Sequence, residues 1–94
     1  MSVYFMFGRY GTDAFKGMSA ERTEEAARII NKFGGEIKEM YALLGEQDLI
    51  FILTFPAMEN AMKAAVALSK STGIAFKTAP AVTVGNFDEM LGDI

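Results

Sequence analysis

Two segments with helical periodicity each lie between apolar runs typical of strands, and this order constrains the fold more than any other feature. The four runs cover residues 3–9, 36–44, 48–55 and 74–84, and the first is dense in β-branched and aromatic residues. The order strand-helix-strand-strand-helix-strand predicts an α+β, ferredoxin-like βαββαβ sandwich. In such a fold, a four-stranded antiparallel sheet carries two helices on one face.

The first long helix has clear signals at both ends. Ser19 is a favourable N-cap, and glycines at positions 34 and 35 end the helix. Between them, apolar residues recur at the helical spacing: Ala26, Ile29, Ile30 and Phe33. Glu24 and Arg28 are four residues apart, so we expect them to form an ion pair on the exposed side.

The remaining elements follow from glycine and proline positions. Pro56 suits the first position of the second long helix, and Gly73 ends that helix. Residues 45–47 form the turn between the two central runs. Pro80 cannot donate to a neighbouring strand, so it indicates an edge strand or a break. Single helical turns are expected at residues 12–17 and in the tail around Phe87.

The 94-residue chain contains no histidine and no cysteine, and its net charge is −3. Without cysteine it forms no disulfide, zinc finger or iron–sulfur cluster. Without histidine it has no Ser-His-Asp triad and no imidazole base. Any metal site would need carboxylates, and no calcium-loop spacing occurs, so we expect neither a metal nor a cofactor.

The acidic balance argues against electrostatic binding to nucleic acid or to an anionic membrane. No apolar stretch approaches the roughly 20 residues of a membrane span, and the start of the chain lacks the pattern of a signal peptide. The expectation is therefore one domain over residues 1–94 that acts in the cytoplasm.

The predicted sheet is apolar on both faces, although a sheet with helices on one face should alternate with polar residues. Residues 3–9 place Phe5 and Phe7 on one side, and Tyr4 and Met6 on the other. Strict alternation in residues 36–44 separates two groups: Met40, Ala42 and Leu44 from Ile37, Tyr41 and Leu43. An uncovered apolar face of this size is unusual in a monomer. A second copy, packed sheet on sheet about a two-fold axis, is the simplest cover.

A second explanation is that the tail folds across the uncovered face. Phe87, Met90 and Leu91 would then serve as its apolar plug.

Some polar residues fall at positions where they could contact a small molecule: Arg9, Tyr10, Arg22, Tyr41, Asp48 and Lys77. Arg22 lies beside the apolar stripe, where it could hold an anion or simply extend its charged end to solvent. Arg9 and Tyr10 end a strand and could line a pocket mouth, or they could be ordinary surface residues.

Asp48 opens the third strand after the turn. It could act as a base or hydrogen-bond acceptor for a ligand, or it could accept from backbone donors of the turn. Tyr41 and Lys77 lie with Tyr4 and Thr78 on strands that could face one cavity, where a tyrosine beside a lysine could stabilise an enolate. The alternative is a packed tyrosine and a solvated lysine. No residue is assigned a catalytic role.

Three segments together resemble the GYD domain family of small bacterial and archaeal proteins. They cover residues 19–23 (SAERT), 40–49 (MYALLGEQDL) and 61–73, and Thr78, Pro80 and Ala81 add to the match. The family's Gly-Tyr-Asp signature corresponds to the turn at residues 45–48, where Gln47 stands in place of tyrosine and Asp48 matches. The resemblance implies a ferredoxin-like, dimeric α+β barrel and carries over no activity.

The favoured function is a homodimeric small-molecule-binding or regulatory module, paired through the sheet face, with a higher oligomer as an open alternative. The alternative is a cofactor-independent isomerase, cyclase or oxygenase for a small carbonyl or phenolic compound, which rests on fold analogy alone. A purely structural assembly unit is a third hypothesis. The missing histidine weighs against acid–base catalysis near neutral pH and against relatives of this fold that degrade haem.

Overall fold

The computed structural model describes residues 1–94, except for the side chain of Phe15. Within these residues, four strands form one antiparallel sheet in the order β2-β3-β1-β4. The strands are β1 (Ser2–Arg9), β2 (Glu36–Ala42), β3 (Leu49–Phe55) and β4 (Ala75–Ala81). The helices are α1 (Thr12–Lys16), α2 (Ala20–Lys32), α3 (Met58–Thr72) and α4 (Val84–Leu91).

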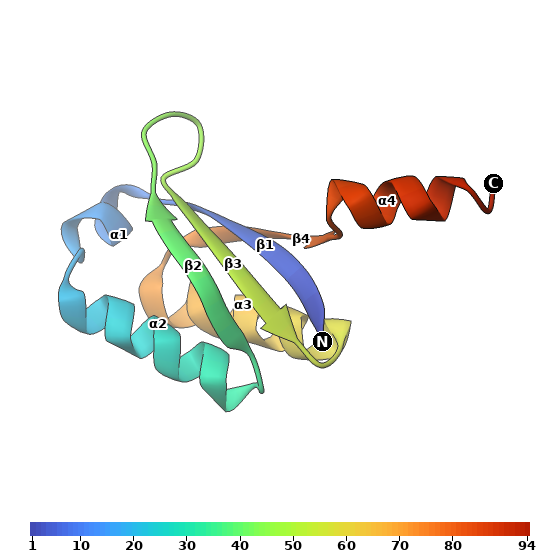
Figure 1. Ribbon diagram of the computed structural model, residues 1–94. Coiled ribbons are helices and arrows are strands. Elements are labelled where there is room, and N and C mark those ends of the chain that lie inside the picture. The colour runs from blue at the N-terminus through green and yellow to red at the C-terminus, as the bar shows by residue number, and fades with distance from the viewer.

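The long helices α2 and α3 lie side by side on one face of the sheet (Figure 1). This arrangement confirms the predicted α+β, ferredoxin-like sandwich. β4 is an edge strand, as Pro80 predicted. None of the described helices is long and apolar enough to cross a membrane.

The core lies between the sheet and these two helices. Its fully buried large side chains come from β1, β3, α2 and α3: Met6, Leu53, Phe55, Ile30 and Leu68. The ring of Tyr4 packs edge-on against Phe55, with 6.0 Å between the ring centroids. Tyr4 is therefore a core residue and is not available to a ligand.

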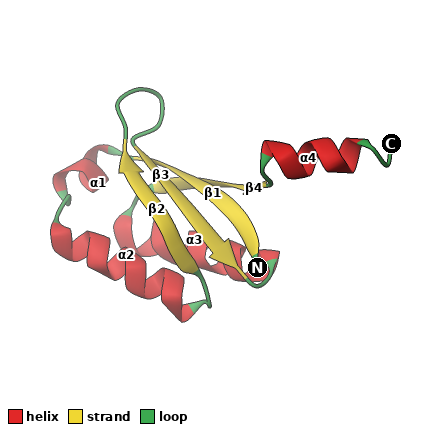
Figure 2. Cartoon of the chain, in the orientation of Figure 1, coloured by secondary structure: helices red, strands yellow, loops and turns green.

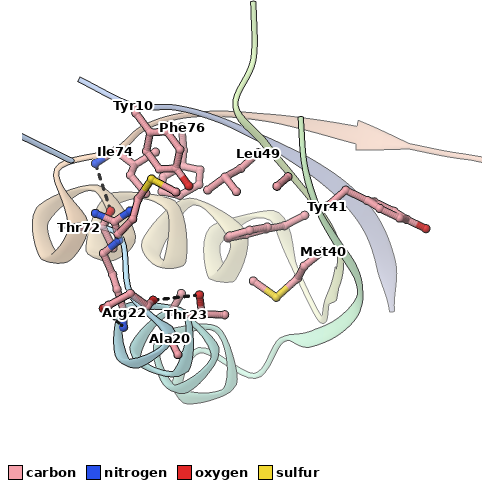
Figure 3. A pocket seen from close by; sticks show the side chains of 15 residues that line it. Tyr10, Ala20, Arg22, Thr23, Met40, Tyr41, Leu49, Thr72, Ile74 and Phe76 are labelled. Atoms are coloured by element: carbon pink, nitrogen blue, oxygen red, sulfur yellow. Dashed lines mark hydrogen bonds between the residues drawn. The ribbon is translucent and has the colours of Figure 1, made fainter. Parts of the chain in front are cut away.

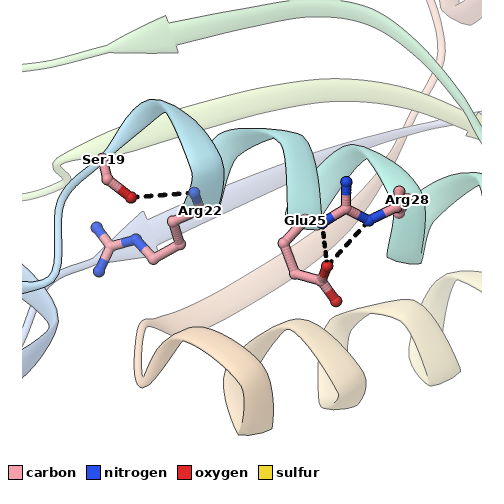
Figure 4. A network of polar contacts seen from close by, with 4 residues as sticks. All are labelled: Ser19, Arg22, Glu25 and Arg28. Carbon is pink, nitrogen blue, oxygen red and sulfur yellow. Dashed lines mark hydrogen bonds and ion pairs between the residues drawn. The ribbon is translucent and has the colours of Figure 1, made fainter.

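The ends of α2 follow the sequence signals, but its predicted ion pair does not form. The Ser19 hydroxyl accepts a hydrogen bond of 3.1 Å from the backbone N–H of Arg22 (Figure 4). Arg28 pairs with Glu25, not with Glu24, and its Nε donates to Glu25 Oε2 at 3.0 Å. The i, i+3 spacing lets two guanidinium nitrogens, Nε and Nη2, reach one carboxylate oxygen.

The start of α3 also differs from the prediction. Pro56 is not the first helical residue, because Ala57 is extended (φ −150°, ψ 160°) and serves as the N-cap of a helix that begins at Met58. Gly73 ends α3 as predicted, with φ +74°, a left-handed conformation that favours glycine.

A β-bulge in β2 changes which of its residues face the helices. Ile37 pairs with Leu53 and Met40 pairs with Phe51, with an irregularity after Ile37 that leaves Lys38 unpaired. Ile37 and Met40 therefore lie on the same face and pack against the core. Strict alternation had placed Ile37 on the same face as Tyr41. That prediction was wrong, because the unpaired Lys38 shifts the alternation of side chains between the two faces by one residue.

The other side of the sheet, here called the second face, carries partly exposed apolar side chains in register across β1 and β3: Val3, Phe5, Phe7, Ile50 and Ile52. The tail does not cover it. α4 projects away from the sheet (Figure 2), and Phe87, Met90 and Leu91 are all exposed. The explanation in which the tail plugs the second face is therefore wrong.

Candidate ligand-binding cavity

A cavity of about 310 Å³ lies between the first half of α2 and the helix-facing side of the sheet (Figure 3). Its volume falls at the lower end of the range of small-molecule sites, roughly 300–1,000 Å³. Its lining comes from α2, the end of α3, strands β2, β3 and β4, and the loops that precede α1, α2 and β4. The lining residues are Tyr10, Met18, Ser19, Ala20, Arg22, Thr23, Ala26, Met40, Tyr41, Ala42, Leu49, Phe51, Thr72, Ile74 and Phe76.

The cavity exists because the two halves of α2 present side chains of different size to the sheet. Ile29, Ile30 and Phe33 fill the space beneath the second half. Ala20, Thr23 and Ala26 occupy the corresponding positions in the first half and line the cavity. Small side chains cannot reach the sheet, so space remains above Met40 and Phe51.

Arg22 is the one charged residue among the described side chains that line this cavity. Its Nη1 donates a hydrogen bond to the carbonyl of Ala14, and its Cζ lies 5.4 Å from the centroid of the Tyr10 ring. A guanidinium has five N–H donors, and among the described residues Ala14 is its only hydrogen-bond acceptor. The charge is therefore held in place while donors remain for a ligand.

Asp48 has a structural position beside the cavity. Its Oδ2 accepts a hydrogen bond of 2.8 Å from the backbone N–H of Tyr10. The Asp48 backbone N–H donates to Gly8 at 2.9 Å, and its carbonyl accepts from Leu43 at 2.8 Å. Asp48 therefore ties the end of β1 to the β2–β3 loop, which fits the structural alternative for this residue.

We expect Asp48→Ala to lower the free energy of unfolding by about 1–3 kcal/mol, because it leaves the Tyr10 amide without its charged acceptor. Asp48→Asn keeps an acceptor oxygen and is expected to lose less. Urea unfolding of the three proteins measures the difference. Equal stability of Asp48→Ala and the parent would show that this hydrogen bond does not hold the loop.

The other candidates do not converge on one cavity. Tyr41 contributes to the wall, but its ring points away from the cavity (Figure 3) and is half-exposed. Lys77 pairs with Phe7 and so lies on the second face, whereas Thr78 pairs with Met6 on the helix side. The interpretation that these strands bring Tyr4, Tyr41, Lys77 and Thr78 to one cavity is therefore wrong. Arg9 is exposed at the end of β1.

Sequence reasoning missed most of the lining because it is apolar. Ser19, Thr23 and Thr72 are the polar residues that it missed, and their hydroxyls are engaged locally. The Thr72 hydroxyl donates to the Leu68 carbonyl at 2.7 Å and accepts from the Ile74 N–H at 3.1 Å. The signal that could have located the cavity is the run of small residues at Ala20, Thr23 and Ala26. In a helix otherwise lined by isoleucine and phenylalanine, these positions leave volume unfilled.

The chemistry of the cavity suits binding. Apolar walls favour a compact hydrocarbon body, and the Arg22 guanidinium favours an anionic group on it. No group of three or more Asp or Glu residues that could hold a metal ion occurs among the residues that the structure describes.

The fold and the cavity define a ferredoxin-like α+β domain with a partly open, largely apolar pocket under its first long helix. Comparison with protein families gives a specific assignment, because residues 4–91 match the GYD domain. The chain belongs to the GYD domain family, as its sequence predicted. No curated protein matches it.

Solved structures that share the fold include two regulatory proteins. The leucine response regulatory protein LrpA of Mycobacterium tuberculosis has a TM-score of 0.58 and 7% identity, covering 88% of this chain and 51% of LrpA. An AsnC family transcriptional regulator from Agrobacterium tumefaciens has a TM-score of 0.58 and 17% identity, covering 86% of this chain and 50% of the regulator. This chain therefore spans about half the length of each.

Proposed function

We propose that this protein is a homodimeric module that binds a small monocarboxylate with an apolar body, of the size of a substituted benzoate. The observation that carries the proposal is Arg22, a fixed cation with spare N–H donors in the wall of an apolar cavity. In the bound state the carboxylate pairs with the guanidinium, and the hydrocarbon part contacts Met40, Phe51 and Phe76.

The second face supports the dimeric part of the proposal. Its five apolar side chains lie in register on a two-strand surface, and a sheet packed against its own copy would bury them. Both copies then keep their cavities, because each cavity opens between the sheet and α2 on the opposite side. Residues 1–94 act as one domain in this proposal.

A regulatory role is the form of this function that the fold favours. The two solved structures compared above are named as a response regulatory protein and a transcriptional regulator. This chain corresponds to about half of each, so we propose only that it senses a ligand and transmits its presence through association. The lack of cysteine is compatible with a reducing cytoplasm, where we expect it to act.

A thermal-shift screen tests ligand binding. We expect benzoates and phenylacetates to raise Tm, with a stabilisation of about 2.7 kcal/mol at 100 times Kd, and their neutral amides to have a smaller effect. Arg22→Met should weaken carboxylate binding about tenfold to a hundredfold, because a hydrogen bond to a charged group is lost.

Lys16→Met is the matched control, since it removes an exposed positive charge that does not line the cavity. The control should bind carboxylates like the parent. Amides that stabilise the protein as well as acids do, or an Arg22→Met variant with unchanged affinity, would contradict the role given to Arg22.

A further inference from the structure

Helix α4 carries an apolar stripe that lies open to solvent. The stripe consists of Val84, Phe87, Met90 and Leu91, whose exposed fractions are 76%, 49%, 52% and 47%. At 100° per residue these four positions fall on one side of the helix. An amphipathic helix of this kind usually gains its stability by packing its apolar side against another surface.

The polar side of α4 is acidic. Asp88 lies at one border of the stripe, and Asp93, just beyond the end of the helix, lies toward the other. Glu89 is on the opposite side, and residues 84–94 contain no lysine or arginine. A surface that accepts α4 should therefore combine an apolar floor with a basic rim.

The outer side of the helical layer offers such a surface. An open groove between the end of α2 and α3, here called the helical groove, has an apolar floor of Phe33, Met62, Val66 and Ala67. Its other lining residues are Lys63 and Lys70. Met62 and Val66 are 59% and 57% exposed and are neighbours at i, i+4, so they form a contiguous apolar patch.

The α4 of the same chain does not reach this groove. Only Val82 and Thr83 separate β4 from α4, and two residues span at most about 7 Å. Thr83 also fixes the direction of the helix, because its hydroxyl accepts from the Asn86 N–H at 3.1 Å. α4 leaves the sheet away from α2 and α3 (Figure 1).

We propose that α4 of one copy docks in the helical groove of a second copy. The stripe packs on the floor, and Asp88 and Asp93 approach Lys63 and Lys70. The contact uses the helical side of the molecule, so it is separate from pairing through the second face and depends neither on that pairing nor on the cavity. Together, the two contacts would link dimers into a larger assembly.

Charge reversal gives the first test, by sedimentation velocity on the full chain. Lys63→Glu with Lys70→Glu should weaken the association through α4 at least about tenfold, because acidic residues would then face the acidic helix. Adding Asp88→Lys and Asp93→Lys to the same chain should restore it. Lys16→Glu with Lys38→Glu makes the same change in net charge away from the groove, and it should leave the association unchanged.

Cross-linking gives the second test, because the chain has no cysteine of its own. A tagged Leu91→Cys chain and an untagged Val66→Cys chain are mixed and oxidised with copper phenanthroline. We expect a disulfide between the two different chains, and far less with Ile52→Cys as the partner. Preferred cross-linking to Ile52→Cys would place α4 on the second face and overturn the proposal.

The remaining outcomes are equally decisive. A Leu91→Cys, Val66→Cys double variant that cross-links within one chain would show that α4 folds back on its own groove. An association that is unaffected by the reversal at Lys63 and Lys70, with no cross-link to Val66→Cys, would show that the groove does not receive α4. Either result overturns the proposal.

Discussion

Ile52→Lys is expected to abolish pairing through the second face and to weaken that dimer at least about a hundredfold. Ile52 pairs with Phe5 in the centre of the second face, next to β1. In the proposed dimer its side chain is enclosed between two sheets, where an unpaired charge costs about 3–5 kcal/mol. Each 1.4 kcal/mol corresponds to a factor of ten in affinity.

Sedimentation equilibrium at micromolar concentration measures this effect. The experiment is best made in a chain that carries Lys63→Glu and Lys70→Glu, so that docking of α4 does not contribute. Met58→Lys is the control, since it adds the same charge to an exposed apolar position on the helical side. A parent chain that sediments as a monomer would refute pairing through the second face.

Gly35→Ala is expected to destabilise the folded chain by about 1–3 kcal/mol, because the added methyl group has no space. A Cβ at this position would lie 2.5 Å from Cε1 of Phe55 and 2.9 Å from Cγ2 of Ile30. Both neighbours are fully buried, so neither can move without disturbing the core. For a domain of this size, 1 kcal/mol corresponds to a fall in Tm of about 4–8 °C.

Urea unfolding at matched protein concentration tests this expectation. Gly11→Ala is the control, because no described atom beyond its chain neighbours lies within 4 Å of a Cβ built there and its φ is not positive. We expect the control to change stability by no more than about 0.5 kcal/mol. Similar stabilities for Gly35→Ala and Gly11→Ala would mean that the connection between α2 and β2 adjusts without cost.

The topology could be predicted because it depends on the order of elements, which local signals define well. Ser19, Gly34 and Gly73 mark helix ends through backbone geometry that few other residues provide. The bulge at Lys38 could not be predicted in the same way. It depends on how β2 pairs with β3, and a single unpaired residue leaves no mark in the hydrophobic pattern beyond one apparent break in alternation.

The candidate site was predicted only in its polar part. Arg22 was singled out beside the apolar stripe of the first long helix and Tyr10 at the end of a strand, and both line the cavity. Apolar lining residues such as Met40 and Phe51 look identical to core residues in a sequence. Whether they face a packed helix or an open space depends on the size of the side chains opposite, here Thr23 and Ala26.

Two neighbouring residues of β2 face the two sites proposed for this protein. Met40 lines the cavity, and its neighbour Tyr41 lies on the side of the sheet that the proposed partner covers, because successive side chains of a strand point to opposite faces. Adjacent residues share a peptide unit, so if a ligand displaced the backbone at Met40, the backbone of Tyr41 would move with it. By thermodynamic linkage such a coupling would act in both directions, so association at Tyr41 would change the affinity for a ligand at Met40 by the same factor as the ligand changes the association.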